Sequence, residues 1–315
     1  MFVVIGTTNA DLIVSGMERW PRGEGDEFTA SSLVFCDEPL AMILGGNGGN
    51  SAYVLARLGA PVALASAIGT DPLGDTLAAW LADVGVEMGA LVRSAAHATA
   101  STTILVDPAE HRLSFHHPGA SWAFEAADVR SDLIEQADVL LASSYPLLKR
   151  WRPDGFRQVL ASAHRHGATT ALDIGPAIGE PATLDELAPL LPDVDYLIAN
   201  AYELAVCTGT DRVEEGMARA LEAGAACVVV KKGKAGTVRA DKAEAEAVPG
   251  FPVEARTTVG AGDAFNAGFL FGIREDWGLS RSVRFGNATA ALVVSAAQGV
   301  LGAPDRAHVQ ALLDE

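Results

Sequence analysis

The chain has 315 residues, and 49% of them are hydrophobic, which is enough for a large buried core. Its 23 lysines and arginines stand against 40 aspartates and glutamates, a formal net charge of −17. Nucleic acids and anionic membranes bind basic surfaces, so this balance argues against both as partners. The three cysteines are widely separated and the first residues carry no basic stretch, which favours a soluble, cytoplasmic protein without a signal peptide.

Short β-branched segments alternate with helical patterns along most of the chain. The predicted strands are Val3–Gly6, Val62–Ile68, Asp138–Ala142, Thr169–Ile174, Tyr196–Ala199 and Cys227–Lys231. The predicted helices are Gly48–Leu58, Pro72–Val84, Gly155–His166, Glu214–Ala223, Ala264–Arg274 and Arg281–Ala297. This alternation is typical of an α/β fold, in which helices cover both faces of a mostly parallel sheet and ligands bind at the carboxyl ends of its strands.

Two stretches interrupt the alternation. Residues 13–35 contain Gly16, Pro21, Gly23 and Gly25 and show no helical period. Residues 101–116 are predicted to form a hairpin around Asp107-Pro108-Ala109-Glu110. Both stretches could form a small β layer over the strand ends, or they could be extra edge strands of the main sheet.

Polar and glycine residues follow the first strand and precede the first helix. Asn9 and Asp11 are spaced by two, so in an extended chain both side chains point the same way. An amide and a carboxylate suit a polyhydroxylated ligand, although the same pair could stabilise a turn. The sequence Gly45–Asn50 lets the backbone approach a ligand closely, and it matches neither a Walker A loop nor a dinucleotide-binding fingerprint.

Three later features lie where predicted strands or helices would meet a ligand. Asn200 and Glu203, three apart at a helix start, suit the water shell of Mg²⁺ bound to phosphates, or they form a capping box. Lys231–Gly236 supplies positive charge and two glycines, although solvated surface lysines would explain it equally well. Asn287 lies on the last long helix, where it could reach a purine or be an ordinary polar residue.

The most informative stretch is Thr257–Phe269. Gly260 and Gly262 bracket a tight turn before an apolar helix, and the free N–H groups and dipole of a helix N-terminus can hold a phosphate or a charge-rich transition state. Asp263 lies beside this anion site, where it could orient a hydroxyl group and accept its proton. The dipole is expected to lower the pKa of Asp263. The alternative is an ordinary glycine turn in which Asp263 caps the helix.

Taken together and in this order, these motifs resemble the ribokinase-like (PfkB-type) carbohydrate kinases. The most specific signatures are Gly45–Ala52 and Thr258–Phe265, with Asn200–Glu203 and Gly233–Gly236 between them. The resemblance implies a three-layer α-β-α fold with a mostly parallel central sheet, and transfer of the ATP γ-phosphoryl group to a sugar hydroxymethyl group. It also implies a small β-sheet lid formed by residues 13–35 and 101–116, and a main domain formed by residues 1–12, 36–100 and 117–315.

The resemblance also implies roles for single residues. The catalytic base would be Asp263, and the anion hole would be formed by Gly260, Ala261 and Gly262. The sugar would be held by Asn9, Asp11, Gly45, Gly46 and Asn50. The nucleotide would be held by Asn200, Lys231, Gly233, Gly236 and Asn287, and Mg²⁺ would be organised through water by Glu203 and Asn200. In several members of the family the lid sheets pair between subunits, which predicts a homodimer.

Three departures from the family pattern bear on the substrate. Thr257 stands where many members carry an aspartate linked to monovalent-cation binding, and this neutral hydroxyl argues against potassium activation. Ser144 falls near the position of a sugar-binding acid in ribokinases, and Asp173–Pro176 lacks the nearby arginine of several fructokinase-like members. No basic cluster follows the hairpin, so a non-phosphorylated sugar is favoured. His116 and His117 could shape the sugar pocket or be purely structural.

The sequence therefore predicts an ATP-dependent kinase of a free sugar or a sugar derivative. A nucleoside kinase of the same family is the alternative, and a non-catalytic sugar- or nucleotide-binding protein is a third possibility. The presence of Asp263 together with Gly260–Gly262 disfavours a non-catalytic protein. The absence of a dinucleotide fingerprint after the first strand disfavours a nicotinamide-dependent dehydrogenase.

Overall fold

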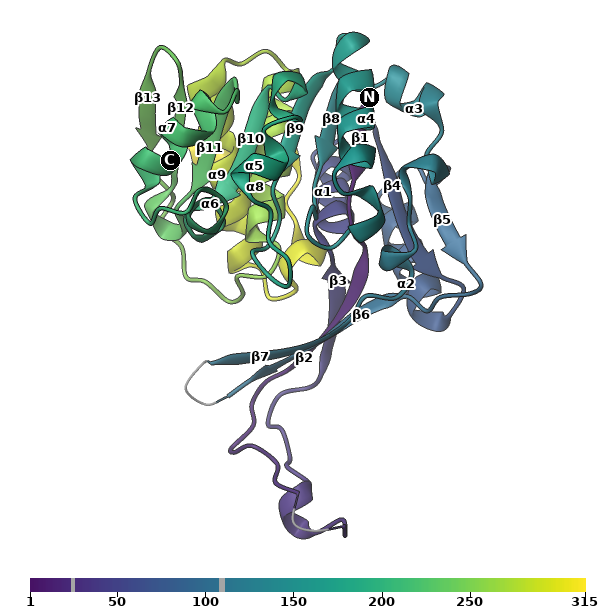
Figure 1. Cartoon of the computed structure of the whole chain (residues 1–315). Coiled ribbons are helices and arrows are strands. Elements are labelled where there is room, and N and C mark those ends of the chain that lie inside the picture. Colours follow the sequence, from purple (N-terminus) through teal and green to yellow (C-terminus); the bar gives the residue numbers. More distant parts are fainter. Residues whose placement is uncertain (24–25, 108–110) are drawn as a thin grey trace.

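The computed structural model describes residues 1–23, 26–107 and 111–315. In this part of the chain a nine-stranded sheet lies between two layers of helices (Figure 1). The order of its strands is β13-β12-β11-β10-β9-β8-β1-β4-β5. Their bounds are β1 (Phe2–Ile5), β4 (Val62–Gly69), β5 (Leu91–Ser94), β8 (Val139–Ala142), β9 (Thr169–Asp173), β10 (Tyr196–Asn200), β11 (Cys227–Lys231), β12 (Thr237–Asp241) and β13 (Ala245–Val248).

All neighbouring strands from β5 to β11 pair in parallel, and β12 and β13 add an antiparallel edge. One face of the sheet is covered by α3 (Ser131–Glu135), α4 (Asp154–Arg165), α5 (Leu184–Leu187), α6 (Ala201–Thr208) and α7 (Val213–Glu222). The other face is covered by α1 (Asn47–Arg57), α2 (Pro72–Asp83), α8 (Ala261–Arg274), α9 (Leu279–Ser295) and α10 (Arg306–Asp314). The mostly parallel three-layer fold predicted from the alternation is therefore confirmed.

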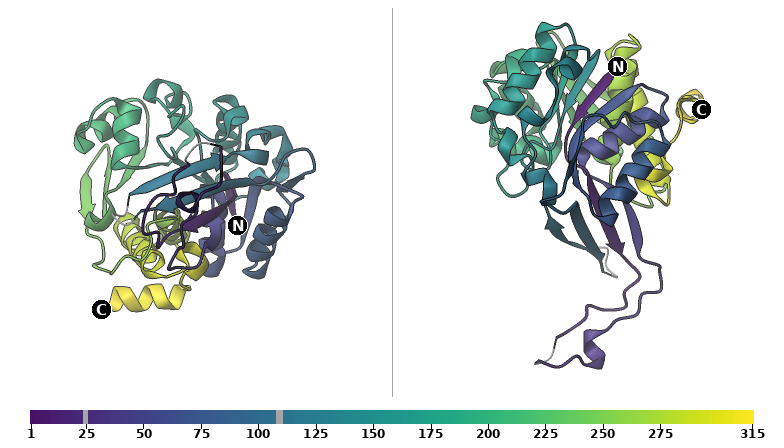
Figure 2. Two further views of the ribbon diagram at one scale, coloured as in Figure 1. Left: turned by 90° about the horizontal axis from the view of Figure 1, so that it is seen from below. Right: turned by 90° about the vertical axis from the view of Figure 1, so that its right-hand side faces the viewer.

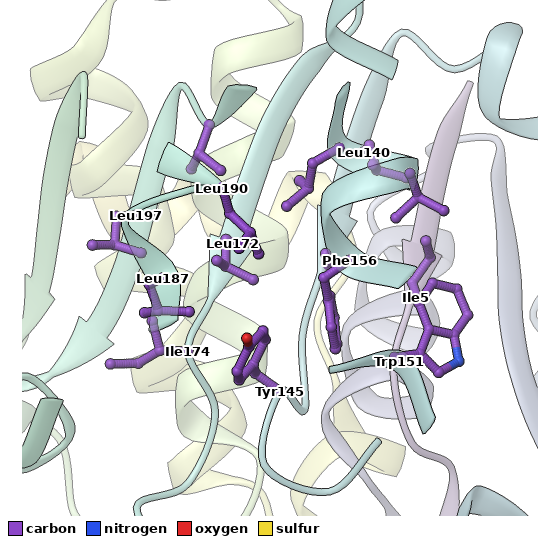
Figure 3. Close-up of a cluster of buried hydrophobic side chains, with 14 of the residues drawn as sticks. Ile5, Leu140, Tyr145, Trp151, Phe156, Leu172, Ile174, Leu187, Leu190 and Leu197 are labelled. Atoms are coloured by element: carbon purple, nitrogen blue, oxygen red, sulfur yellow. The ribbon is translucent and has the colours of Figure 1, made fainter. Parts of the chain in front are cut away.

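The protein has a hydrophobic core on each face of the large sheet. Successive side chains of a parallel strand alternate between these two cores, as expected for a sheet buried on both faces. In β1, Val3 and Ile5 pack into the core with α3 to α7, whereas Phe2 and Val4 pack into the core with α1, α8 and α9. Figure 3 shows part of the first core, in which Tyr145, Trp151 and Phe156 lie beside leucines of β8, β9 and α5. The aromatic residues fix the chain that leaves the carboxyl end of β8.

A second sheet, here called the small sheet, is formed by β2 (Asn9–Val14), β3 (Ala41–Gly45), β6 (Ala100–Val106) and β7 (Arg112–His117) in the order β3-β2-β6-β7. It leaves the main body at the end where the parallel strands of the large sheet have their carboxyl ends (Figure 1). The described residues between β2 and β3 extend further away from the main body, as the right-hand view of Figure 2 shows.

The bounds of the small sheet differ from the predicted ones. Its first strand already begins at Asn9, and Ala41–Gly45 forms a strand that the sequence analysis did not predict. This strand is a short apolar run that leads directly into the glycine motif. Beyond β2, the described residues between 15 and 35 include one short 3-10 helix, Ala30–Ser32. The predicted hairpin is confirmed as β6 and β7, but its turn residues 108–110, like Gly25, lie outside the described residues.

In the described part of the chain, no helix combines the length and the apolar composition needed to cross a membrane.

Candidate functional site

A cavity of about 970 Å³ lies at the carboxyl ends of β9, β10 and β11, beside the N-terminus of α8. Because parallel strands end at the same edge, residues far apart in the sequence meet there. Ten of the predicted site residues line the cavity: Asn200, Glu203, Lys231, Gly233, Gly236, Gly260, Ala261, Gly262, Asp263 and Asn287. The predicted sugar-binding residues are absent from this lining and lie on the small sheet and on α1.

The anion site predicted at the glycine turn has the required geometry. Gly260 precedes α8 with a φ of 77°, a conformation that favours glycine, and a Cβ atom there would lie 2.2 Å from Val300. The helix begins at Ala261, so Ala261 and Gly262 form its first turn. The first N–H groups of a helix have no partner within it, and they point out of its N-terminus with the positive end of the dipole. Here that end borders the cavity.

Asp263 is buried, and both of its carboxylate oxygens accept hydrogen bonds from α1. Asn47 Nδ2 donates to Oδ1 and Asn50 Nδ2 donates to Oδ2, each at 2.8 Å. No side chain caps α8, so the alternative in which Asp263 serves as a helix cap is wrong. The carboxylate instead lies between the glycine motif of α1 and the cavity.

Burial raises the pKa of Asp263 to about 6, although the bonds from Asn47 and Asn50 work in the opposite direction. The prediction that the helix dipole lowers this pKa was therefore wrong. Asp263 is only 6% exposed, and loss of water around a carboxylate outweighs the partial charge of a helix end. A carboxylate with a pKa near 6 is still ionised at neutral pH and is a better proton acceptor than an exposed aspartate.

Lys231 forms a buried ion pair beside the anion site. Its Nζ lies 2.7 Å from Asp173 Oδ2 and 3.4 Å from Asn266 Oδ1, and Asn266 Nδ2 donates to the same Asp173 oxygen. A Cβ atom at Gly262 would lie 3.2 Å from Nζ, which places the ammonium group against the first turn of α8. The explanation of Lys231 as a solvated surface lysine is wrong, whereas Lys234 is exposed.

Burial opposes the charge on Lys231, but the carboxylates of Asp173 and Glu203 outweigh it and raise the pKa of this lysine above its ordinary value. Lys231 is therefore a fixed positive charge at neutral pH. Asp173 and Asn266 were missed as site residues in the sequence. Asp173 is the last residue of β9 and lies one residue before the end of the predicted strand Thr169–Ile174, and that position was the available signal because ligands are expected at such ends.

Asn200 and Glu203 form the capping box of α6. Asn200 Oδ1 accepts from the Glu203 N–H at 2.8 Å, and Glu203 Oε2 accepts from the Asn200 N–H at 2.7 Å. Burial and the charge of Asp173 raise the pKa of Glu203 to about 7. Across the described residues, no three His, Cys, Asp or Glu side chains are grouped closely enough to hold a metal ion by themselves. A metal at this site would therefore need ligands from water or phosphate.

Asn9 and Asp11 lie side by side in β2, so the interpretation of this pair as a turn is wrong. Asn9 Nδ2 donates to Asp11 Oδ1 at 2.5 Å and lies 3.3 Å from Thr102 Oγ1 on β6. Burial raises the pKa of Asp11 to about 6, and the nearby charge of Asp263 adds to this effect. The sugar-binding residues predicted on the small sheet thus lie close enough to Asp263 to sense its charge.

Gly45 and Gly46 connect the small sheet to α1, and neither has room for a side chain. A Cβ atom at Gly45 would lie 2.4 Å from Asp11 Oδ2, and one at Gly46 would lie 2.8 Å from Asn9 Oδ1. The two glycines therefore allow the backbone to pass directly beside the polar pair. Asn50, in α1, connects this region to Asp263.

The predicted nucleotide residues at the other end of the cavity shape its wall. Asn287 Oδ1 accepts from Thr237 Oγ1 at 2.7 Å, and its Nδ2 donates to the carbonyls of Val248 and Pro249. Both amide hydrogens of Asn287 are thus used to hold β13 against α9. Gly236, with a φ of 90°, lies so close to Val248 that a Cβ atom would be 2.2 Å from its carbonyl oxygen.

The chain is similar to known proteins over nearly its whole length. The model of the pfkB family carbohydrate kinases matches residues 3–306. A ribokinase of Haemophilus influenzae is 27% identical over 299 residues, covering 93% of this chain and 91% of that protein. A 5-dehydro-2-deoxygluconokinase of Geobacillus kaustophilus is 26% identical over 329 residues, covering 100% of this chain and 93% of that protein.

Among solved structures, that of Arabidopsis thaliana ribokinase complexed with ribose and ATP is similar with a TM-score of 0.84 and 25% identity, covering 100% of this chain and 98% of that one. The family match and the shared fold both extend over nearly the whole chain. The chain therefore belongs to the pfkB family of ribokinase-like carbohydrate kinases.

Proposed function

We propose that the protein transfers the γ-phosphoryl group of ATP to a hydroxymethyl group of a non-phosphorylated sugar or sugar derivative. The observation that carries this proposal is the position of Asp263. Its carboxylate is buried between the cavity beside the α8 N-terminus and the polar residues Asn9 and Asp11 of the small sheet. The γ-phosphate of ATP in the cavity and the hydroxyl group of a sugar held by Asn9 and Asp11 would therefore meet at this carboxylate.

In this mechanism, Asp263 orients the acceptor hydroxyl and accepts its proton as the oxygen attacks the γ-phosphorus. The N–H groups at the start of α8 and the Lys231 ammonium stabilise the negative charge on the transferring group. Both are in place before substrate arrives, since Asp173 and Asn266 hold Lys231 at the same edge of the cavity. Little reorganisation of charge is then needed during the reaction.

The buried amide of Asn50 supports a hydroxyl-bearing substrate. Its Nδ2 donates to Asp263, but its Oδ1 has no hydrogen-bond partner among the described residues and is buried. Leaving a buried amide oxygen unpaired costs stability, so such an atom indicates a missing donor. A sugar hydroxyl beside Asp263 would supply that donor. The carboxylates of Asp11 and Asp263 would repel an acceptor that already carries a phosphate.

The site also fits Mg²⁺ bound through the nucleotide. Asp173 and Asp263 place negative charge beside Lys231, and Glu203, with a pKa of about 7, adds to it where it is ionised, so a divalent cation would reduce the repulsion between this site and the phosphates of ATP. Asn200 and Glu203 line the cavity and would hold the water shell of the ion, because Mg²⁺ keeps several waters in such sites. Bound Mg²⁺ would neutralise charge on the phosphate oxygens.

The test of the proposed function is a coupled ADP-release assay over free sugars, sugar acids, phosphorylated sugars and nucleosides, with ATP and Mg²⁺. We expect ADP release with a free sugar or sugar derivative. Mass spectrometry should then show a product that is heavier than this sugar by one phosphoryl group. Turnover only with nucleosides or with phosphorylated sugars would contradict the proposed acceptor. A protein that binds these compounds but releases no ADP would contradict catalysis.

The activity is expected to fall on the acid side of about pH 6, because Asp263 must be ionised to accept a proton and its pKa is about 6. Protonation of a single base gives a slope of one in log kcat against pH. Asp11 also titrates near this pH, and Glu203 titrates near pH 7. A pH–rate profile of the Asp11→Asn variant distinguishes the two aspartates. If the acid limb belongs to Asp263, it should persist and move slightly to lower pH, because a neighbouring negative charge has been removed, whereas a limb that belongs to Asp11 should disappear.

We also propose that the small sheet pairs with that of a second copy. Leu12, Leu113 and Phe115 share the face opposite to Asp11 and Thr102, and they are 37%, 53% and 65% exposed. A second small sheet would remove this apolar face from water. Light scattering is expected to show a dimer that Phe115→Asp weakens and the matched surface change Val206→Asp on α6 does not. A monomeric wild-type protein at micromolar concentration would contradict this pairing.

A further inference from the structure

Ser144, just after β8, lies in the left-handed region with a φ of 60°, which residues other than glycine rarely adopt. The backbone conformation of Ser144 is held by the turn that follows it and by the burial of the next side chain. The carbonyl of Ser144 accepts bonds from the N–H groups of Leu147 and Leu148 at 2.9 and 3.1 Å. The next side chain, Tyr145, is buried in the first core with its ring centroid 4.7 Å from that of Phe156 (Figure 3). The fold thus fixes where the Ser144 hydroxyl lies.

This hydroxyl connects the β1–β2 junction to the glycine motif. Ser144 Oγ accepts from the Thr7 N–H at 3.1 Å, lies 3.0 Å from Thr7 Oγ1 and donates to Asn47 Oδ1 at 3.1 Å. A hydroxyl group has one proton to donate. Since Ser144 gives its proton to Asn47, Thr7 Oγ1 must donate to Ser144. The direction of every bond in this series is therefore determined.

The same series determines the orientation of the Asn47 amide. With Oδ1 held by Ser144, the Nδ2 group faces Asp263 Oδ1 and donates to it at 2.8 Å. An amide turned by half a rotation would place its oxygen against an ionised carboxylate and repel it. Asn50 is different, because its Oδ1 has no partner in the described part of the protein. Of the two amides that hold Asp263, Asn47 is the one fixed by a second residue.

We propose that Ser144 is a positioning residue that acts through Asn47: its hydroxyl fixes the amide that holds Oδ1 of Asp263, so that Oδ2, which accepts from Asn50, keeps its second lone pair directed at the acceptor hydroxyl. This inference rests on the proposed function for its effect on turnover. The hydrogen-bond series itself does not depend on which sugar is the substrate. The role of Asp263 can therefore be followed in the protein with and without turnover.

Charged groups from several elements surround Asp263. Asp11 on β2, Asp173 at the end of β9 and Glu203 on α6 are acidic, and Lys231 on β11 is basic. None of them bonds to Ser144. Replacing Ser144 by alanine therefore changes the hydrogen bonding of Asp263 through Asn47 and leaves these charges in place. Because the Asn47 bond lowers the pKa of Asp263, weakening that bond should raise this pKa above about 6.

The first experiment follows Asp263 directly by ¹³C-carboxyl NMR titration of the whole protein, with its signal assigned from the Asp263→Asn variant. We expect the pKa of Asp263 to rise in Ser144→Ala and in Asn47→Ala. The matched control is Ser143→Ala, because Ser143 is equally buried but its hydroxyl donates to the Ile5 carbonyl. An unchanged pKa in Ser144→Ala, or the same rise in Ser143→Ala, would overturn the inference even if the protein shows no turnover.

The second experiment measures kcat and KM with the sugar found in the substrate screen. Losing one orienting hydrogen bond is expected to lower kcat about tenfold in Ser144→Ala, with little change in KM for the sugar. Ser144→Gly removes the hydroxyl but relieves the backbone conformation, so it should show the same loss of kcat with a higher melting temperature than Ser144→Ala.

The decisive comparison is the double variant Ser144→Ala/Asn47→Ala. A residue that acts through Asn47 adds nothing once Asn47 is gone, so the double variant should be no slower than Asn47→Ala alone. Losses that multiply in the double variant would show that Ser144 acts independently and would contradict the inference. Absence of ADP release by the wild type with every substrate would instead refute the proposed function, and the NMR titration would still decide the role of Ser144.

Discussion

Asp263→Asn is expected to lower kcat by about 10²–10⁴-fold and to leave KM for ATP and for the sugar within a few-fold of the wild-type values. Asparagine has the same shape but cannot accept the proton of the acceptor hydroxyl. The anion site at the start of α8 is made by the backbone and stays intact. Steady-state kinetics with the best substrate of the screen would measure both parameters.

A matched control for this change is Asp75→Asn, which removes an acid from the first turn of α2, outside the cavity. It should leave kcat unchanged. If Asp263→Asn kept near-normal turnover, Asp263 would not be the base, and the proton would have to leave by another route. A loss in KM alone would instead assign Asp263 to substrate binding.

Lys231→Met is expected to lower kcat by about 10²–10³-fold, the usual effect of removing one preorganised group that stabilises transition-state charge. Methionine fills the space of the lysine stem but carries no charge. The exposed Lys242, which lies between β12 and β13 and outside the cavity lining, provides the matched control, and Lys242→Met should leave kcat unchanged. A kcat for Lys231→Met close to that of the wild type would exclude Lys231 from catalysis.

This change also leaves the Asp173 carboxylate buried without its cation, which costs roughly 3–5 kcal/mol of stability. A second variant separates this effect from catalysis. In Lys231→Met/Asp173→Asn the buried charge is removed as well, so the melting temperature should recover while kcat stays low. Recovery of both stability and kcat would show that Lys231 serves only to balance Asp173.

The large sheet was predictable because each of its central strands is an apolar run bounded by turn residues. Val62–Ile68 and Cys227–Lys231 agree with β4 and β11 to within one residue. Edge elements such as β5, with its half-buried residues, and β13 carry no such pattern and were missed. A strand covered on one side only does not need a continuous apolar sequence.

The sequence predicted those parts of the candidate site in which the glycines and the acid belong to one motif, as in Gly260–Asp263. The parts in which residues meet only through the fold were not predictable. Asp173 and Lys231 are 58 positions apart, and nothing in either segment indicates that the pair is buried. The protonation of Asp263 was also not predictable, because it depends on how completely the surrounding elements exclude water.

The connection between the two sheets has a consequence for the choice of acceptor. Only residues 6–8 separate β1, which lies between β8 and β4 in the large sheet, from β2, which carries Asn9 and Asp11. Asn9 and Asp11, which we propose to bind the acceptor, are thus connected by a short segment to the large sheet that also carries Lys231, whereas Thr102 and His116 belong to β6 and β7, further along the chain. Under the proposed function, a change of sugar preference should therefore begin on β7, because Thr102 on β6 already bonds to Asn9 and its substitution would disturb the acceptor residues of β2.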